Sequence, residues 1–277
     1  MTEARQGEKV WATPEEAFAS EEAQRLKQEI VDVGRKLWLR QYVDGNGGNI
    51  SARLTDEWVL CTPTLLSKAD LTVDDICMVD MEGHSVAGTR RRSSEILLHL
   101  AIFGTVPEAR AVVHCHPPHA TAYALAGVVP PERMLAEHEV FVGPVAYLPY
   151  ETPGTQACAN DVIPFAKEHN TILMANHGLV TWADSVTHAE WYVEVMDTTC
   201  RVLILAGQLG PLPKPIPIER IGGLLALKKK LGMRDVRFGP TAASEPEPVV
   251  LPGGVTSLPR PCATPPALPS DEEADMF

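Results

Sequence analysis

Two histidines separated by one residue, His114 and His116, stand at the end of an apolar run. The run Ala111–Val113 is rich in valine, which favours strands, and Pro117 and Pro118 cannot continue a central strand. In a strand, residues two apart project to the same side, so both imidazoles are expected to lie together. Such a pair is typical either of surface histidines or of two ligands of a divalent metal.

His177 is the best candidate for a third ligand. It follows the apolar run Thr171–Ala175 and precedes Gly178, which allows the backbone to turn sharply. Three neutral imidazoles on a divalent metal leave a coordination position open for substrate. Taken alone, a histidine at a strand end is more often an ordinary polar residue with ordinary partners.

Glu95 is the candidate catalytic residue. Ser93 and Ser94 precede it, and either could cap a helix that runs through Phe103, which places Glu95 in the first turn. A carboxylate close to a metal could remove a proton beside a carbonyl group that the metal polarises. The alternative is an ordinary glutamate of a first helical turn.

A set of small and hydroxyl-bearing residues could bind an anion. The Gly47–Asn49 turn could present backbone N–H groups, and Thr64, Ser93 and Ser94 could add hydroxyl donors. The basic run Arg90–Arg92 raises the local potential but is more typical of a solvated surface. A few local donors of this kind can hold a phosphate in an acidic protein, so a phosphorylated small substrate is compatible with the sequence.

Other catalytic signatures fail on specific residues. Binuclear hydrolases of the HxHxDH type need an aspartate where this chain has Pro118. A cupin pattern needs a glutamate near the positions of Ala120 and Thr121. The sequence contains no G-x-S-x-G, Walker A or Rossmann glycine pattern.

Composition indicates a globular protein. The 277 residues are 45% hydrophobic and 22% charged, and the net charge of −12 argues against nucleic-acid binding. No apolar run reaches the length of a membrane span, and the start does not resemble a signal peptide. Six cysteines without a CxxC pair fit reduced thiols. We therefore expect a cytoplasmic protein without a membrane partner.

The chain is expected to consist of an N-terminal arm (1–19), one domain (20–236) and a proline-rich flexible tail (237–277). Apolar spacing and capping residues predict a helix start at Thr13–Glu16 and the main helices and strands of the domain. The predicted helices cover 20–41, 93–103, 120–126, 160–168, 186–207 and 218–232. The predicted strands cover 50–54, 58–61, 77–80, the run that ends at His116, 139–142, 145–148 and 171–175. Residues 179–182 are expected to continue the last of these strands.

Six motifs in order give the chain a resemblance to the class II aldolase/adducin family. They are Gly48-Asn49-Ile50-Ser51, Thr62-Pro63-Thr64, Ser93-Ser94-Glu95, His114-Cys115-His116, Pro149-Tyr150 to Pro153-Gly154-Thr155 and Asn176-His177-Gly178-Leu179. The resemblance implies a three-layer α/β/α domain with a mostly antiparallel central sheet, and a homotetramer with sites between subunits. It implies Zn²⁺, or another divalent metal, on His114, His116 and His177, with Glu95 as the base. It places the substrate phosphate on Gly48, Asn49, Thr64, Ser93 and Ser94.

The chain looks most like the L-fuculose-phosphate aldolase branch but departs from it at the aldehyde end. Tyrosines of those aldolases are expected near Leu135 and Leu231, and a glycine at Leu65. The nearest polar replacements lie at 137–139, among which His138 is a possible accessory residue.

The resemblance therefore predicts a metal-dependent aldehyde-lyase. We expect a zinc-dependent aldolase that cleaves a sugar 1-phosphate to dihydroxyacetone phosphate and an aldehyde through a metal-stabilised enediolate. One alternative is a dehydratase or decarboxylase of a related sugar phosphate or sugar acid. Another is an adducin-like scaffold without catalysis.

Overall fold

The computed structural model describes residues 11–211, 213–233 and 235–238, which form an eight-stranded sheet with helices on both faces. The strand order is β4-β3-β2-β1-β5-β8-β7-β6, and every neighbouring pair is antiparallel except β6 with β7. The strands are β1 (Asn49–Arg53), β2 (Trp58–Cys61), β3 (Cys77–Asp80), β4 (Ser85–Ala87), β5 (Ala111–Cys115), β6 (Ala146–Leu148), β7 (Thr171–Met174) and β8 (Gly178–Ala183).

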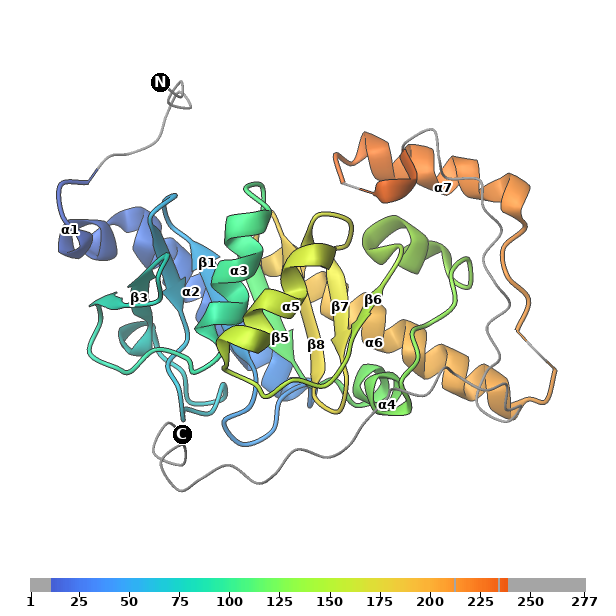
Figure 1. Cartoon of the computed structure of the whole chain (residues 1–277), viewed down its shortest axis with the longest axis horizontal. Helices are drawn as coiled ribbons and strands as arrows, with labels where there is room; N and C mark the ends of the chain where they lie inside the picture. The colour runs from blue at the N-terminus through green and yellow to red at the C-terminus, as the bar shows by residue number, and fades with distance from the viewer. Residues whose placement is uncertain (1–10, 212, 234, 239–277) are drawn as a thin grey trace. The chain divides into compact units, whose positions relative to one another are not determined.

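Two hydrophobic clusters, one on each face of the sheet, give the domain its three layers. One cluster packs α1, α2, α4 and α6 against the sheet, and the other packs α3 and α5 against the opposite face. In Figure 1, α3 and α5 lie in front of the sheet, and α2 and α6 lie behind it. The helices are α1 (Pro14–Ala19), α2 (Glu21–Leu39), α3 (Ile96–Thr105), α4 (Pro118–Ala126), α5 (Gln156–Ala166), α6 (Val186–Gln208) and α7 (Ile218–Lys230). The predicted α/β/α fold with a mostly antiparallel sheet is confirmed.

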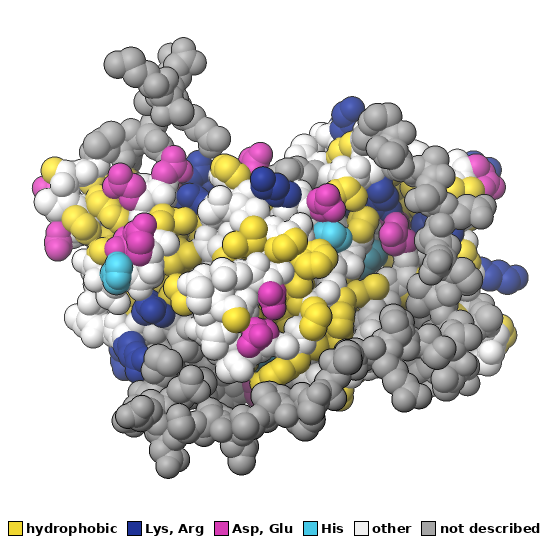
Figure 2. All heavy atoms as spheres, viewed as in Figure 1, with side chains coloured by type: hydrophobic (Ala, Val, Ile, Leu, Met, Phe, Trp, Pro, Cys, Tyr) yellow, Lys and Arg dark blue, Asp and Glu magenta, His cyan; other side chains and the backbone are white. Residues whose placement is uncertain are grey.

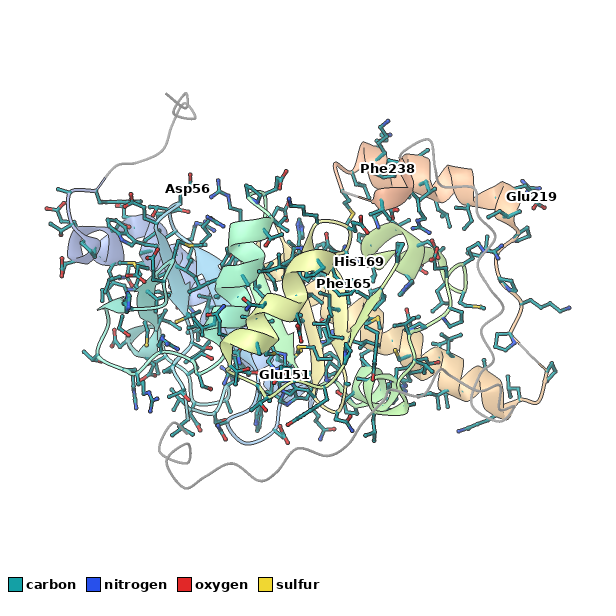
Figure 3. All side chains as sticks on the ribbon, viewed as in Figure 1. Asp56, Glu151, Phe165, His169, Glu219 and Phe238 are labelled. Carbon is teal, nitrogen blue, oxygen red and sulfur yellow. The ribbon has the colours of Figure 1, made fainter. Side chains whose placement is uncertain are left out.

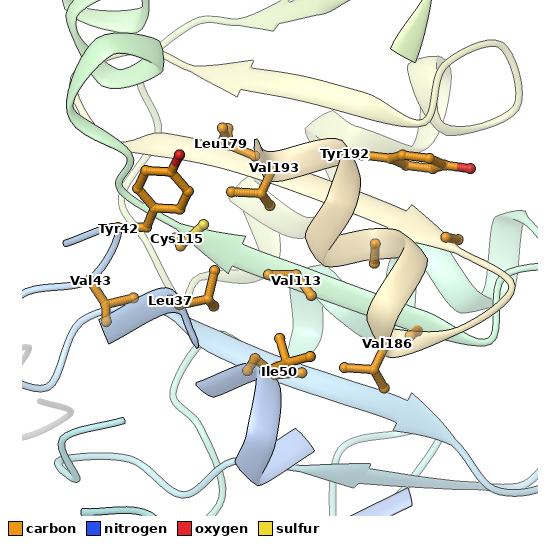
Figure 4. Close-up of a cluster of buried hydrophobic side chains, with 14 of the residues drawn as sticks. Leu37, Tyr42, Val43, Ile50, Val113, Cys115, Leu179, Val186, Tyr192 and Val193 are labelled. Atoms are coloured by element: carbon orange, nitrogen blue, oxygen red, sulfur yellow. The ribbon is translucent and has the colours of Figure 1, made fainter. Parts of the chain in front are cut away.

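Strand β5 shows how the alternation of side chains directs the histidines. Val113 and Cys115 face the cluster beneath α2 and α6, where Ile50 and Val193 also lie (Figure 4). Val112 faces the opposite cluster beneath α3 and α5. Because side chains two apart share a face, His114 is directed to the α3 side of the sheet.

The N-terminal helices begin where capping residues predict. The Thr13 side chain accepts a hydrogen bond from the Glu16 N–H, and Ser20 caps α2 in the same way. Ala17 is buried, so the part of the expected arm that is described here is a helix packed on the domain. Residues 1–10 of the expected arm lie outside the described residues.

The strand predicted over 139–142 is wrong. Residues His138–Val142 form a π-helical turn, η2, which ends at Gly143 with a positive φ of 79°. The Gly143 N–H donates to the His138 carbonyl at 2.7 Å. Glu139 turns inward, where its carboxylate accepts from the Arg133 N–H and pairs with Arg237 at 2.5 Å. These contacts come from Arg133 and from the distant Arg237, and no local strand pattern reflects them.

Three other boundaries also differ from the predictions. Strand β8 does not continue β7 but pairs with it antiparallel after a tight turn at Asn176 and His177. Glu95, rather than Ser93 or Ser94, occupies the N-cap position of α3. Helix α5 begins at Gln156, where the Thr155 hydroxyl accepts from the Cys158 N–H.

Most of the predicted tail lies outside the described residues. Its first two residues, Arg237 and Phe238, belong to the short 3-10 helix η3 (Val236–Phe238), and Arg237 is joined to the domain by ion pairs.

Figure 2 shows lysine and arginine side chains scattered singly or in small groups over one face, alongside aspartate and glutamate. Across the described part of the chain, no helix is long and apolar enough to span a membrane.

Candidate metal centre and active site

The end of strand β5 brings His114 and His116 together as their spacing predicts. Their Nε2 atoms lie 3.2 Å apart. The strand ends at Cys115, and α4 begins at Pro118. The proline pair ends the strand directly after the two imidazoles, which therefore lie at the end of a central strand that pairs with β1 and β8.

The turn between β7 and β8 brings the third imidazole. His177 lies with its ring centroid 4.6 Å from that of His114 and 5.2 Å from that of His116. Asn176 adopts a positive φ of 55°. A Cβ atom at Gly178 would approach the Cys115 carbonyl to 2.5 Å, so glycine is required where the turn passes β5.

The donor set fits a divalent metal. One ligand atom from each histidine lies within 4.8 Å of the others. Burial lowers the pKa of all three imidazoles, that of His177 to about 4, which keeps them neutral and able to bind a metal at pH 7. His114 Nδ1 donates to the Leu179 carbonyl at 2.9 Å, which leaves the Nε2 lone pair free for a metal.

Glu95 reaches the triad from the N-cap position of α3. Its carboxylate oxygens lie 3.4 Å from His114 Nε2 and 3.5 Å from His177 Nε2. Oε1 is buried and makes no hydrogen bond to the described residues. Burial raises the pKa of the Glu95 carboxyl, while the Asn49 amide and the Lys68 ammonium oppose that rise. A carboxyl in this position can hold a proton or coordinate a metal.

A buried hydrogen-bonded chain behind Glu95 was not predicted from the sequence. Asn49 Nδ2 donates to Glu95 Oε2, His99 Nε2 donates to Asn49 Oδ1, and Ser51 Oγ donates to His99 Nδ1, each at 2.6 Å. Burial lowers the pKa of His99 to about 3, so its ring is neutral with one donor and one acceptor. This series of hydrogen bonds therefore fixes the orientation of the Asn49 amide, with Nδ2 toward Glu95 and Oδ1 toward His99. The spacing of Glu95 and His99 on one helix face was the signal that could have found it.

The predicted phosphate-binding residues come from three neighbouring segments. The Thr64 N–H donates to the Arg91 carbonyl, and the Ser93 N–H donates to the Thr62 carbonyl, each at 3.1 Å. These bonds pair the two segments antiparallel, so that Thr62 lies opposite Ser93 and Thr64 lies opposite Arg91. The exposed Ser94 follows Ser93 directly.

Gly48 and Asn49 lie on the metal side of these segments. A Cβ at Gly48 would come within 2.9 Å of the His114 carbonyl, so Gly48 lies against the strand that carries the histidines. The Asn49 side chain is directed at Glu95. Leu65, which stands where a glycine is expected, adopts the positive φ of 56° that glycine would favour.

His138 lies apart from the triad. It is 1% exposed, and neither ring nitrogen makes a hydrogen bond to the described residues. The charged groups around it are Glu139, Lys228 and Arg237. Its place in η2 gives no support for an accessory role at the metal centre.

A cavity beside α6 and α7 is also separate from the triad. It has a volume of about 690 Å³ and is lined by residues of α6, α7 and the β6–β7 side, including His169, Leu231 and Phe238. Figure 3 shows Phe165 and His169 close together on this side, with Phe238 beside α7. None of the predicted site residues lines it.

The fold and the site define a class of protein: the chain belongs to the class II aldolase and adducin family. Residues 28–204 match the model of the family's class II aldolase and adducin N-terminal domain. The resemblance inferred from the six motifs is thereby confirmed. Class II aldolases depend on a metal, and the substrates of the family are phosphorylated sugars.

Particular relatives include enzymes with two different activities. The chain is 35% identical over 182 residues to a 3-oxo-tetronate 4-phosphate decarboxylase of Cupriavidus necator, covering 64% of this chain and 83% of the relative. It is 32% identical over 185 residues to an L-fuculose phosphate aldolase of Methanococcus maripaludis, covering 65% and 97%. The solved structure of YgbL from Klebsiella pneumoniae superposes with a TM-score of 0.68 at 29% identity, over 73% of this chain and 98% of that chain.

Proposed function

We propose that this protein is a metal-dependent lyase that decarboxylates a phosphorylated 3-oxo sugar acid. The similarity to 3-oxo-tetronate 4-phosphate decarboxylases indicates the substrate class. The observation that carries the proposal is the single buried carboxyl of Glu95, with a raised pKa, within 3.5 Å of two imidazoles of the triad. Decarboxylation is one of the alternatives to aldol cleavage that the sequence leaves open.

The reaction needs one proton at one carbon. In 3-oxo-tetronate 4-phosphate the bond between C1 and C2 breaks, its electron pair moves into the C2–C3–oxygen system, and carbon dioxide leaves. A divalent metal on His114, His116 and His177 would supply positive charge that favours this electron movement. Glu95 in its protonated form gives its proton to C2, which yields dihydroxyacetone phosphate, and then regains a proton from solvent.

The residues of this chain fit decarboxylation better than they fit aldol cleavage. Aldol cleavage also needs a base for the hydroxyl on the carbon that becomes the aldehyde. Leu135 and Leu231 stand where tyrosines are expected in the aldolases, and neither can take a proton. A carboxylate substrate is already ionised, so decarboxylation needs no second base.

The proposal assigns separate roles to the remaining site residues. Gly48, Thr64, Ser93 and Ser94 bind the substrate phosphate through backbone and hydroxyl donors. Asn49 holds Glu95 in place through its amide. The phosphate anchors the end of the substrate that does not react, which leaves the carboxylate end at the triad.

Product analysis tests the proposal directly. Metal-loaded protein is incubated with 3-oxo-tetronate 4-phosphate carrying carbon-13 at C1, and separately with a panel of ketose 1-phosphates. NMR spectra are expected to show labelled bicarbonate together with dihydroxyacetone phosphate from the sugar acid. Release of dihydroxyacetone phosphate from a ketose 1-phosphate alone would contradict decarboxylation.

Aldol cleavage is the second candidate function. The 32% identity to the L-fuculose phosphate aldolase supports cleavage of a fuculose 1-phosphate-like ketose by a zinc-dependent enzyme. The same NMR experiment separates the two reactions, because aldol cleavage releases an aldehyde and no bicarbonate. A dehydratase would keep every substrate carbon in one product. An adducin-like scaffold is disfavoured because the three histidines and Glu95 converge.

We also propose zinc as the metal, a homotetramer as the assembly and the cytoplasm as the location. Three histidine nitrogens are donors that suit zinc. Exposed apolar side chains on α2 and α6, such as Trp38, Leu39 and Trp191, support association of chains. The five described cysteines are buried free thiols, which fits a reducing compartment.

A further inference from the structure

Lys68 is a buried lysine at the edge of the metal centre. The residue is only 2% exposed, and Nζ donates to the carbonyls of Asn46 and Leu66, each at 3.1 Å. Among the described residues, no carboxylate lies within ion-pair distance of its ammonium. Burial of an ammonium without a counter-ion is unfavourable, so an anion supplied by a ligand would stabilise it.

The surroundings of Lys68 place its charge inside the proposed site. Asn46 belongs to the glycine-rich turn that leads to Gly48, and Leu66 belongs to the loop that follows Thr64. The ammonium acts electrostatically on Glu95 and on His116. The two segments that Lys68 joins are therefore those assigned to the substrate phosphate.

The bonding capacity of Lys68 is incompletely used. An ammonium group has three N–H donors, and two of them are directed at the Asn46 and Leu66 carbonyls. Burial lowers the pKa of Lys68 to about 8, with Glu95 opposing the shift, so the charged form still predominates at pH 7. The two carbonyl bonds fix Nζ, and the third N–H is available to an oxygen of a ligand.

We propose that Lys68 is a substrate-binding residue whose third N–H bonds an oxygen of the substrate phosphate. This inference rests on the proposed function, because it concerns the phosphorylated end of the same substrate. Lys68 adds a full positive charge to a set that otherwise consists of neutral donors from Gly48, Thr64, Ser93 and Ser94. In a chain of net charge −12, the Lys68 ammonium gives the site its selectivity for a phosphate ester.

Binding measurements test the inference without relying on turnover. Isothermal titration of the metal-loaded protein uses two probes: glycerol 3-phosphate, which carries a phosphate ester, and erythronate, a four-carbon sugar acid without phosphate. K68M removes the charge at similar volume, and K68Q keeps a donor for the Asn46 and Leu66 carbonyls. K167M is the control, because Lys167 is an exposed lysine at the end of α5.

The expected result is a 10- to 100-fold weaker affinity of both Lys68 variants for glycerol 3-phosphate, which is about the value of one charge-assisted hydrogen bond. Erythronate affinity and the behaviour of K167M are expected to match the wild type. Unchanged affinity for glycerol 3-phosphate in K68Q would overturn the inference, as would loss of erythronate affinity alone. Absence of measurable glycerol 3-phosphate binding by the wild type would overturn it as well.

The two proposals can fail separately. If the wild type releases bicarbonate from the sugar acid and the Lys68 variants bind glycerol 3-phosphate normally, the function stands and the role of Lys68 is wrong. If binding depends on Lys68 but no bicarbonate forms, the binding role stands and decarboxylation is wrong.

Discussion

Glu95 combines burial with proximity to two imidazoles, and these two properties determine the behaviour expected of its variants. E95Q keeps the size of the side chain but cannot transfer a proton. We expect turnover to fall by about 10²- to 10⁴-fold, the usual contribution of general acid–base catalysis, with metal content unchanged. Steady-state kinetics and metal analysis of the same preparation check this. E57Q serves as the control because Glu57 is exposed in the β1–β2 turn. Turnover of E95Q at the wild-type rate would remove Glu95 from the proton-transfer role.

His99 acts on the reaction through Asn49 and is therefore a positioning residue. H99L leaves Asn49 Oδ1 and the Ser51 hydroxyl without their hydrogen-bond partner in the core, which is expected to destabilise the fold by about 1–3 kcal/mol. It also frees the Asn49 amide to turn away from Glu95, so kcat is expected to fall at temperatures where the variant remains folded. H99Q, which can still donate to Asn49, is expected to recover part of kcat. Equal kcat values for H99L and H99Q would reduce His99 to a structural role.

At the scale of elements, a buried ion network fixes α7 and the following segment to η2. Asp235 accepts from Lys228 and from Arg237 at 2.8 Å each, and Arg237 also pairs with Glu139. Burial by itself would raise the pKa of Asp235, but the bonds from Arg237 and Lys228 outweigh it and lower the pKa to about 2. The network joins segments that the sequence places far apart.

This network makes the attachment of α7 sensitive to acid. Because the folded-state pKa of Asp235 lies below its unfolded value near 4, its stabilising contribution is complete above about pH 4. That contribution is lost as the pH falls toward 2. Hydrogen exchange of α7 at pH 7 and at pH 3 is expected to show reduced protection at the lower pH.

D235N provides the matched comparison for the acid effect. It removes the titrating group and breaks a buried ion pair, so protection of α7 is expected to be about 3 kcal/mol weaker at pH 7. Its protection should also respond less to acid than that of the wild type. A wild-type α7 whose protection is the same at pH 3 and pH 7 would contradict this account of the network.

The sequence predicts the elements whose pattern reflects burial and misses those fixed by distant partners. The spacing of His114 and His116, and a glycine after His177, are local features, and the structure brings these residues together as expected. The η2 turn depends on Arg237, about a hundred residues beyond Glu139, which no local pattern shows. The role of Asn49 beside Glu95 likewise depends on His99, a buried side chain that has no distinctive sequence motif.

At the scale of the whole molecule, the proposed homotetramer has a direct measurement. Family resemblance and exposed apolar side chains on α2 and α6 support it. Sedimentation equilibrium is expected to give a mass about four times that of the chain. Replacing Trp38 and Leu39 together by glutamate should lower that mass if this surface is buried between chains, while substitution at the exposed Glu57 should not. A wild-type mass equal to that of one chain would contradict the tetramer.

The central claim is that the three histidines form a metal centre, because every proposed chemical step depends on it. The measurement that tests it most directly is the metal content of purified protein and of H177A by inductively coupled plasma mass spectrometry. We expect about one divalent metal ion, predominantly zinc, per wild-type chain, and a large loss in H177A with its circular dichroism spectrum retained. Wild-type protein that stays free of metal after dialysis against stoichiometric zinc would contradict the account.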